Sequence, residues 1–156
     1  MTSPDIPGFD AFSELQFALT LADLADEITL PRYTNRSFSI DRKPDRSEVT
    51  QADREAEAAI SAAVQEQRPD HALFGEEHGL VGPTDSPWRW IIDPVDGTRS
   101  FIDAKPDFGV IVALARGDEV LAGWILQPCT GRRAATEHGA GVTRHGPSPE
   151  AEPAHD

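Results

Sequence analysis

Hydrophobic residues recur at every third or fourth position in two separate stretches of the chain. The first stretch covers residues 10–30, and the second begins near Thr50 and runs to about residue 66. This spacing places apolar side chains on one face of an α-helix, so it predicts two amphipathic helices. We expect Pro31 to end the first helix, because proline lacks an amide hydrogen and clashes with the preceding turn. Thr50 is a typical N-cap for the second helix.

Other apolar and β-branched runs predict strands. A weak alternation surrounds residues 38–40, a short apolar run covers residues 72–74, and residues 88–92 form a strong strand candidate. Two apolar segments, 109–115 and 120–126, are separated by a short polar turn, which predicts a β-hairpin. The predicted fold class is therefore α+β, with two helices packed on a mostly antiparallel sheet.

The charge of the chain narrows its partners. The 156 residues include 14 Lys and Arg against 27 Asp and Glu, a net charge of −13. An excess of this sign repels phosphate backbones and anionic lipid, so we expect neither a nucleic-acid nor a membrane partner. The length suits one domain. We expect residues 1–143 to form it and residues 144–156, which hold no large apolar side chain, to form a flexible tail.

The single cysteine and the first residues bear on localisation. Cys129 has no second cysteine with which to form an internal disulfide or a cysteine-based zinc site, which suggests a reducing compartment. The first five residues lack the basic and apolar regions of a secretory signal, and the longest apolar run is too short to span a membrane. We therefore expect a cytoplasmic protein.

Three acidic groups, in residues 49–53, 75–77 and 93–98, carry the candidate chemistry. Each has an ordinary explanation alone: Asp53 can cap a helix with Thr50, the glutamates can be solvated loop charges, and an Asp-Gly pair can be a simple turn. An acidic globular domain without a site would follow from these explanations. However, a plain turn does not need two aspartates three residues apart with a proline between them, so the third group favours a function.

Taken together, the acidic groups supply the oxygen ligands that Mg²⁺ prefers. A strand end followed by a tight turn can aim Asp93 and Asp96 into one site, where the Val95 carbonyl can add another oxygen. Glu76 would complete the set from a separate loop, and a bound cation would remove the repulsion between the carboxylates. Gly97 lets the backbone approach a ligand, and amides there can cradle a phosphate. The pattern predicts metal-assisted phosphate hydrolysis.

Three separate motifs also keep a particular order and spacing. They are Lys43-Pro44-Asp45-x-Ser47-x-Val49-Thr50-x-Ala52-Asp53, Gly75-Glu76-Glu77 and Trp90-Ile91-Ile92-Asp93-Pro94-Val95-Asp96-Gly97-Thr98. Together they resemble the inositol monophosphatase superfamily over roughly residues 10–146. The stretch 96–102, and Gln127-Pro128 followed by Gly131-Arg132, are similar to its histidinol-phosphatase branch. The resemblance implies the N-terminal half of a layered αβαβα fold.

The resemblance implies a metal-binding role for four residues. Glu76, Asp93 and the Val95 carbonyl would hold one Mg²⁺, and Asp93 with Asp96 would hold a second, more weakly bound one. Lys43 lies in a loop that, in the family, closes over the metals.

The resemblance also implies a catalytic pair and a set of substrate contacts. The Thr98 hydroxyl, oriented by Asp53, would position and activate the attacking water, so both residues are catalytic candidates. The residues expected to bind the substrate are Glu76, Val95, Asp96, Gly97 and Thr98.

The implied activity is Mg²⁺-dependent hydrolysis of a small phosphomonoester, foremost L-histidinol phosphate to L-histidinol and phosphate in histidine biosynthesis. Two alternatives stay open: an inositol-1-phosphate phosphatase, and a truncated, inactive member that binds metal without turnover. The second rests on the family's C-terminal half, whose Trp-Asp motif binds the second metal, whereas none of Trp88, Trp90 and Trp124 precedes an aspartate. Loss of that half would uncover apolar surface, so we expect either poor solubility or association into a homo-oligomer.

Overall fold

The computed structural model describes residues 7–137 and 141–145. Neither of the two long helices in this part of the chain has the apolar length that crossing a bilayer requires. The elements are α1 (Ala11–Asn35), β1 (Ile40–Arg42), β2 (Glu48–Thr50), α2 (Gln51–Gln67), β3 (Ala72–Gly75), β4 (Gly79–Val81), β5 (Trp88–Asp96), α3 (Thr98–Ile102), β6 (Gly109–Arg116), β7 (Glu119–Leu126), β8 (Arg133–Glu137) and β9 (Gly141–His145).

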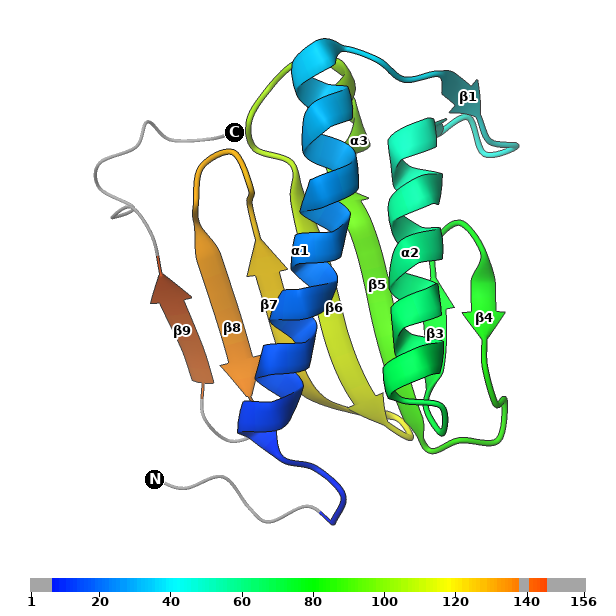
Figure 1. Ribbon diagram of the computed structural model, residues 1–156, viewed down its shortest axis with the longest axis vertical. Helices are drawn as coiled ribbons and strands as arrows, with labels where there is room; N and C mark the ends of the chain where they lie inside the picture. Colours follow the sequence, from blue (N-terminus) through cyan, green and yellow to red (C-terminus); the bar gives the residue numbers. More distant parts are fainter. Residues whose placement is uncertain (1–6, 138–140, 146–156) are drawn as a thin grey trace.

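The elements form two layers, with α1 and α2 side by side on one face of a seven-stranded sheet (Figure 1). The strand order is β4-β3-β5-β6-β7-β8-β9, and β1 pairs separately with β2. Only β3 and β5 are parallel among these described strand pairs; the others are antiparallel. The predicted hairpin is confirmed as β6 and β7, with Arg116 opposite Glu119. The α+β class is therefore confirmed.

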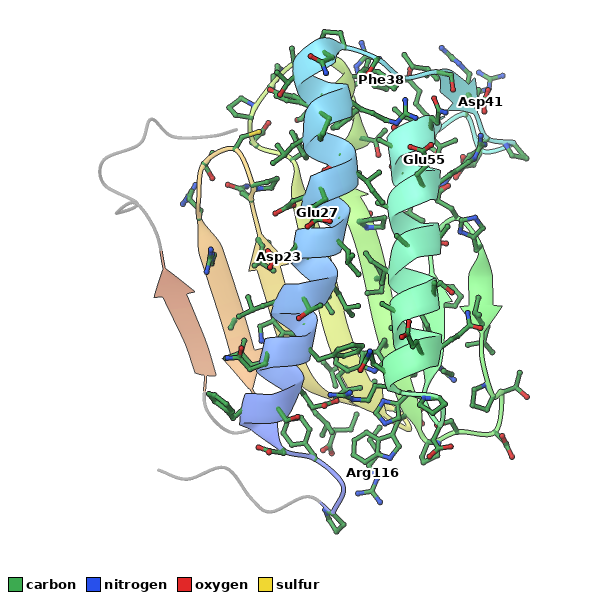
Figure 2. All side chains as sticks on the ribbon, in the orientation of Figure 1. Asp23, Glu27, Phe38, Asp41, Glu55 and Arg116 are labelled. Carbon is green, nitrogen blue, oxygen red and sulfur yellow. The ribbon has the colours of Figure 1, made fainter. Side chains whose placement is uncertain are left out.

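The expectation that Pro31 ends the first helix is wrong, because α1 continues through it to Asn35. Pro31 is exposed, and so is Glu27 four residues earlier, whose side chain is labelled in Figure 2. The Glu27 carbonyl has no amide at position 31 from which to accept its usual helix hydrogen bond. Water can hydrate that carbonyl, which lowers the cost of the missing bond. Beyond the proline, Arg32 holds the last turn to α2 through two contacts with Glu55, at 2.6 and 2.9 Å.

The hydrophobic pattern does not predict every strand of the described chain. β4 lies within residues 75–87, where the hydrophobic pattern predicts no strand, and β8 and β9 extend the sheet beyond the predicted hairpin. These strands carry mostly small or polar residues and pair through the backbone, so their sequences show little alternation. The expected tail starts at residue 144, whereas β9 includes residues up to His145; residues 146–156 lie outside the described chain.

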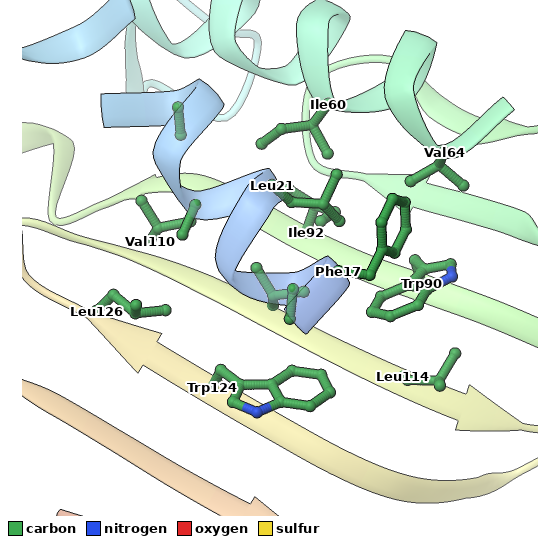
Figure 3. Close-up of a cluster of buried hydrophobic side chains, with 14 of the residues drawn as sticks. Phe17, Leu21, Ile60, Val64, Trp90, Ile92, Val110, Leu114, Trp124 and Leu126 are labelled. Atoms are coloured by element: carbon green, nitrogen blue, oxygen red, sulfur yellow. The ribbon is translucent and has the colours of Figure 1, made fainter. Parts of the chain in front are cut away.

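The main core fills the space between the helices and the sheet (Figure 3). Trp90 of β5 is fully buried and meets Phe17 of α1 edge-on, with ring centroids 5.3 Å apart. Removing a buried aromatic side chain costs about 3–5 kcal/mol, so these rings anchor α1 on β5. A smaller cluster of Ala52, Val95, Phe101 and Phe108 joins the start of α2 to the end of β5 and to α3.

The sheet face opposite the helices carries exposed apolar side chains. Phe74 of β3 pairs with Ile91 of β5, and both alternate with residues that point into the core. Ile125 of β7 follows the same pattern. These three side chains are 48%, 37% and 47% exposed. The sheet is therefore covered on one face and apolar on the other.

We predict that this apolar face causes self-association. The chain should elute from a size-exclusion column larger than a 17 kDa monomer, increasingly so at higher concentration. The double variant Ile91→Thr, Ile125→Thr should shift elution toward the monomer. Phe12→Ser, which removes an exposed apolar ring on α1, should not. A compact monomer at every concentration would contradict the prediction.

Asp26 of α1 is a partly buried carboxyl group near Arg133 of β8. Its Oδ1 atom is buried without a hydrogen-bond partner in the described chain. Burial and the neighbouring charge of Asp23 raise the pKa of Asp26 to about 6, although Arg133 opposes that rise. Because the folded-state pKa lies above the unfolded one, the fold loses stability as pH rises from about 4 through 6.

Asp26→Asn should therefore stabilise the protein at pH 8 and have little effect at pH 4. After discounting for solvent screening, we expect about 1 kcal/mol, or about 2–4 °C in melting temperature. Thermal melts at the two pH values measure this difference. Glu27→Gln, on the exposed side of the same helix, should change the melting temperature little. An equal effect of Asp26→Asn at both pH values would refute the account.

Candidate active site

Asp53 serves two elements at once. Thr50 and Asp53 form a capping box at the start of α2, in which Asp53 Oδ2 accepts from the Thr50 amide at 2.9 Å and from its hydroxyl at 2.5 Å. The other oxygen, Oδ1, accepts a hydrogen bond of 2.9 Å from the Thr98 hydroxyl. The helix-capping interpretation is confirmed, and it leaves one carboxylate oxygen for Thr98.

Burial raises the pKa of Asp53, and the hydrogen bonds from Thr50 and Thr98 oppose that rise. Its side chain is almost fully enclosed by the fold. Thr98 Oγ1 also lies 3.2 Å from the Val95 carbonyl oxygen. A hydroxyl has one hydrogen to donate, and the shorter contact directs it to the Asp53 carboxylate. The two residues, 45 positions apart in the sequence, thus form one hydrogen-bonded pair.

A bulge near the end of β5 explains how two aspartates three residues apart can share a side. Asp93 pairs with Ile111 and Asp96 pairs with Gly109, so β5 holds one residue more than β6 over this interval. Side chains three apart on a regular strand point to opposite faces, and one extra residue restores the match. Pro94 occupies the bulge, where its missing amide disrupts no regular ladder bond.

Gly97 turns the chain from β5 into α3. Its φ is +90°, in the left-handed region that glycine adopts without strain, and it is the N-cap of α3. The hydroxyl of Thr98, the first residue of α3, reaches back to Asp53. Phe101 then anchors the short helix in the smaller core cluster. The turn therefore fixes Thr98 against the start of α2.

The charges of Glu76, Asp96 and Asp53 act on Asp93. Burial first, and then the charges of Glu76 and Asp96, raise the pKa of Asp93 to about 7; a backbone hydrogen bond from Val95 opposes this rise. The loop after β3, the end of β5 and the start of α2 thus bring the carboxylates of Glu76, Asp96 and Asp53 close enough to act on the charge of Asp93.

In the described part of the chain, no three His, Cys, Asp or Glu side chains are close enough to form a ready-made metal site. Glu76 is exposed, which is the arrangement that repulsion between like charges favours. The donor set nevertheless fits a hard divalent cation: it holds carboxylates whose charges oppose the ionisation of Asp93, and a backbone carbonyl. The candidate ligands are Glu76, Asp93, Val95 and Asp96.

Lys43 lies in the turn between β1 and β2 and reaches the loop after β3. Its Nζ atom is 2.5 Å from Glu77 Oε1 and 3.9 Å from Glu76 Oε1. Burial disfavours the charged form of Lys43, but the hydrogen bond and the charge of Glu77 outweigh it and raise the Lys43 pKa. The structure thus places Lys43 beside the acidic loop.

Glu57 is a buried acid of this region that the sequence patterns do not single out. It lies on α2, one turn after Asp53, and accepts hydrogen bonds from the loop that carries Glu76. A signal was available, because a glutamate next to the apolar residues Ala56 and Ile60 falls on the buried side of the predicted helix.

Comparisons with known proteins identify the family of the chain. The sequence profile of the inositol monophosphatase family matches residues 12–155, so the chain belongs to that family. It is 41% identical to a histidinol-phosphatase of Chlorobaculum parvum over 85% of this chain and 51% of that protein. It is 43% identical to an inositol-1-monophosphatase of Mesorhizobium japonicum, over 60% of this chain and 35% of that protein.

Solved structures show the same fold. The extragenic suppressor protein suhB of Bartonella henselae superposes with a TM-score of 0.78 at 28% identity, over 85% of this chain and 52% of that chain. The chain spans about half the length of the curated relatives and solved structures that it matches over most of its own length. It therefore has the helix-on-sheet part of the layered family fold.

We predict that Mg²⁺ stabilises the folded chain through these carboxylates. A ligand at ten times its Kd adds about 1.4 kcal/mol, which corresponds to about 3–6 °C in melting temperature. Millimolar Mg²⁺ should produce such a shift, and Asp93→Asn should abolish it. Asp118→Asn, an equal charge change in the β6–β7 turn, should retain it. A wild-type melting temperature that stays the same with and without Mg²⁺ would contradict the prediction.

Proposed function

We propose that the chain carries the active site of a Mg²⁺-dependent phosphomonoesterase that hydrolyses a small phosphate ester. The observation that carries the proposal is the hydrogen bond from Thr98 to Asp53, next to the carboxylates whose charges raise the pKa of Asp93. The names of the relatives, histidinol-phosphatase and inositol-1-monophosphatase, support the reaction class. L-histidinol phosphate is the proposed substrate, because histidinol-phosphatases match the larger share of the chain. The reaction would then belong to histidine biosynthesis.

In this proposal, Glu76, Asp93 and the Val95 carbonyl hold one Mg²⁺, and Asp93 with Asp96 holds a second, more weakly bound one. When bound, Mg²⁺ supplies a Lewis acid that withdraws charge from the phosphate and its leaving oxygen. Burial and then the charges of Glu76 and Asp96 raise the pKa of Asp93, and a bound cation would relieve the part of this rise that comes from the two charges.

Thr98 and Asp53 orient the attacking water. The Thr98 hydrogen is directed to Asp53 Oδ1, so the lone pairs of Thr98 Oγ1 are free to accept a hydrogen bond from water. As the water attacks phosphorus, the bond between phosphorus and the ester oxygen breaks. The water's proton passes to Thr98 Oγ1 while the Thr98 proton passes to Asp53, and the leaving alkoxide takes a proton from solvent to become the alcohol. Burial raises the pKa of Asp53, which favours its accepting that proton.

The turn at Gly97 supplies the phosphate contact. With no side chain at Gly97, the backbone can approach the phosphate oxygens, and the amides of Gly97 and Thr98 can donate to them. Because the same turn holds the Thr98 hydroxyl, phosphate and water would be positioned by one rigid element.

Inositol 1-phosphate is the second candidate substrate, supported by the identity to the Mesorhizobium japonicum protein. A third possibility is a chain that binds metal without turnover, supported by its span of half the length of its relatives. Phosphate release and Mg²⁺ binding, measured on the same preparation, distinguish these candidates.

We expect Mg²⁺-dependent phosphate release from L-histidinol phosphate to exceed release from inositol 1-phosphate. Asp93→Asn and Thr98→Val should each lower the rate by about 100-fold or more, because they remove a metal ligand and a water-orienting hydroxyl. Asp118→Asn is the control.

The same assay should be repeated with the chain fused to the second half of the Chlorobaculum parvum relative. Equal turnover by wild type and Asp93→Asn in both formats would overturn the proposal. Mg²⁺ binding without turnover in the short chain, with turnover in the fusion, would mean that the site needs the remainder of the family fold.

A further inference from the structure

Glu57 is a fully buried carboxylate that the proposed reaction does not use. Its side chain is 0% exposed, and it belongs to α2, which packs against the sheet. A buried carboxylate costs several kcal/mol unless hydrogen bonds satisfy it, so its partners show what it stabilises. Glu57 Oε1 accepts from the amide of Glu77 at 2.9 Å. Oε2 accepts from the amide of His78 at 2.5 Å and contacts His78 Nδ1 at 2.6 Å.

The hydrogen-bond partners of Glu57 in the described chain belong to the two residues that follow Glu76. Gly75, on the other side of Glu76, lies directly against the same carboxylate. A Cβ added at Gly75 would come within 2.6–2.7 Å of the two Glu57 oxygens, which is closer than side chains tolerate. Position 75 therefore suits glycine because of Glu57.

The backbone of Glu76 is thus held by the residues before and after it in the sequence. Gly75 is held in β3 opposite Gly79 of β4 and beside Ile92 of β5. The next two amides are held by Glu57, so Glu76 keeps only its own side-chain freedom. A ligand whose backbone is fixed loses less entropy when it binds a cation.

We propose that Glu57 is a positioning residue for the metal site, which holds the Glu76 loop against α2 so that Glu76 faces Asp93. This inference rests on the proposed function, in which Glu76 is a ligand, and extends it to a residue that touches neither metal nor substrate. Asp53 and Glu57 lie one helical turn apart, so α2 positions two parts of the site: Asp53 orients Thr98, and Glu57 orients the Glu76 loop.

The first test measures the loop without metal. In the wild-type chain, the amides of Glu77 and His78 should exchange with solvent at least about 100-fold more slowly than free amides, as followed by NMR. Glu57→Gln replaces one acceptor oxygen with a donor, so protection at these two amides should fall by about tenfold or more. Unprotected wild-type amides, or unchanged protection in Glu57→Gln, would overturn the inference.

The second test measures Mg²⁺ affinity by isothermal titration calorimetry. Loss of the groups that orient a ligand weakens metal binding by about 10–100-fold. Glu57 orients Glu76 only through the neighbouring amides of Glu77 and His78, and we expect Glu57→Gln to fall in this range. Glu55→Gln is the matched control: it removes the same charge from the same helix and breaks the contacts with Arg32, but it should leave Mg²⁺ affinity within about twofold. A folded Glu57→Gln that binds Mg²⁺ as the wild type does would contradict the inference.

Gly75→Ala provides an independent route if Glu57→Gln does not fold. It keeps every charge and displaces Glu57 from the opposite side, so it should also lower amide protection and Mg²⁺ affinity. The outcomes separate the two proposals. A wild-type chain that does not bind Mg²⁺ contradicts the proposed function, whereas the exchange rates of Glu77 and His78 decide whether Glu57 holds the loop.

Discussion

Repulsion between carboxylates at the end of β5 is the constraint on which the site depends. Asp93 has a pKa of about 7 because burial and the charges of Glu76 and Asp96 oppose its ionisation. A fold would gain stability by replacing such a group with a neutral one, unless a cation offsets the repulsion. The bulge that holds Asp93 and Asp96 near one another therefore favours a functional role for the two carboxylates over a stabilising one.

The remainder of the fold makes this arrangement rigid. Trp90 and Phe17 fix α1 to β5, and the smaller cluster of Val95, Phe101 and Phe108 holds the strand end, its turn and α3 together. α2 then reaches the site at two levels, through Asp53 to Thr98 and through Glu57 to the loop of Glu76. Because both acids belong to one helix, a shift of α2 would disturb both contacts.

The sequence predicts those parts that depend on local patterns. Apolar spacing finds both helices, and the capping signal of Thr50 places the start of α2 correctly. The prediction from Pro31 is wrong because an exposed helix face tolerates the missing hydrogen bond. Which face of the helix is exposed depends on tertiary contacts, which the local sequence does not show. The β5 bulge and the contacts of Glu57 join residues distant in sequence, so no local pattern contains them. Family resemblance names Glu76, Asp93 and Asp96 together, whereas their distances depend on the folded chain.

A crystal structure of the chain grown with Mn²⁺, read by its anomalous scattering, tests the central claim most directly. The account predicts a peak within bonding distance of carboxylate oxygens of Asp93 and Glu76, near the Val95 carbonyl, with the Thr98–Asp53 hydrogen bond intact. An ordered metal bound elsewhere, or metal-soaked crystals in which these carboxylates remain apart and unliganded, would contradict it.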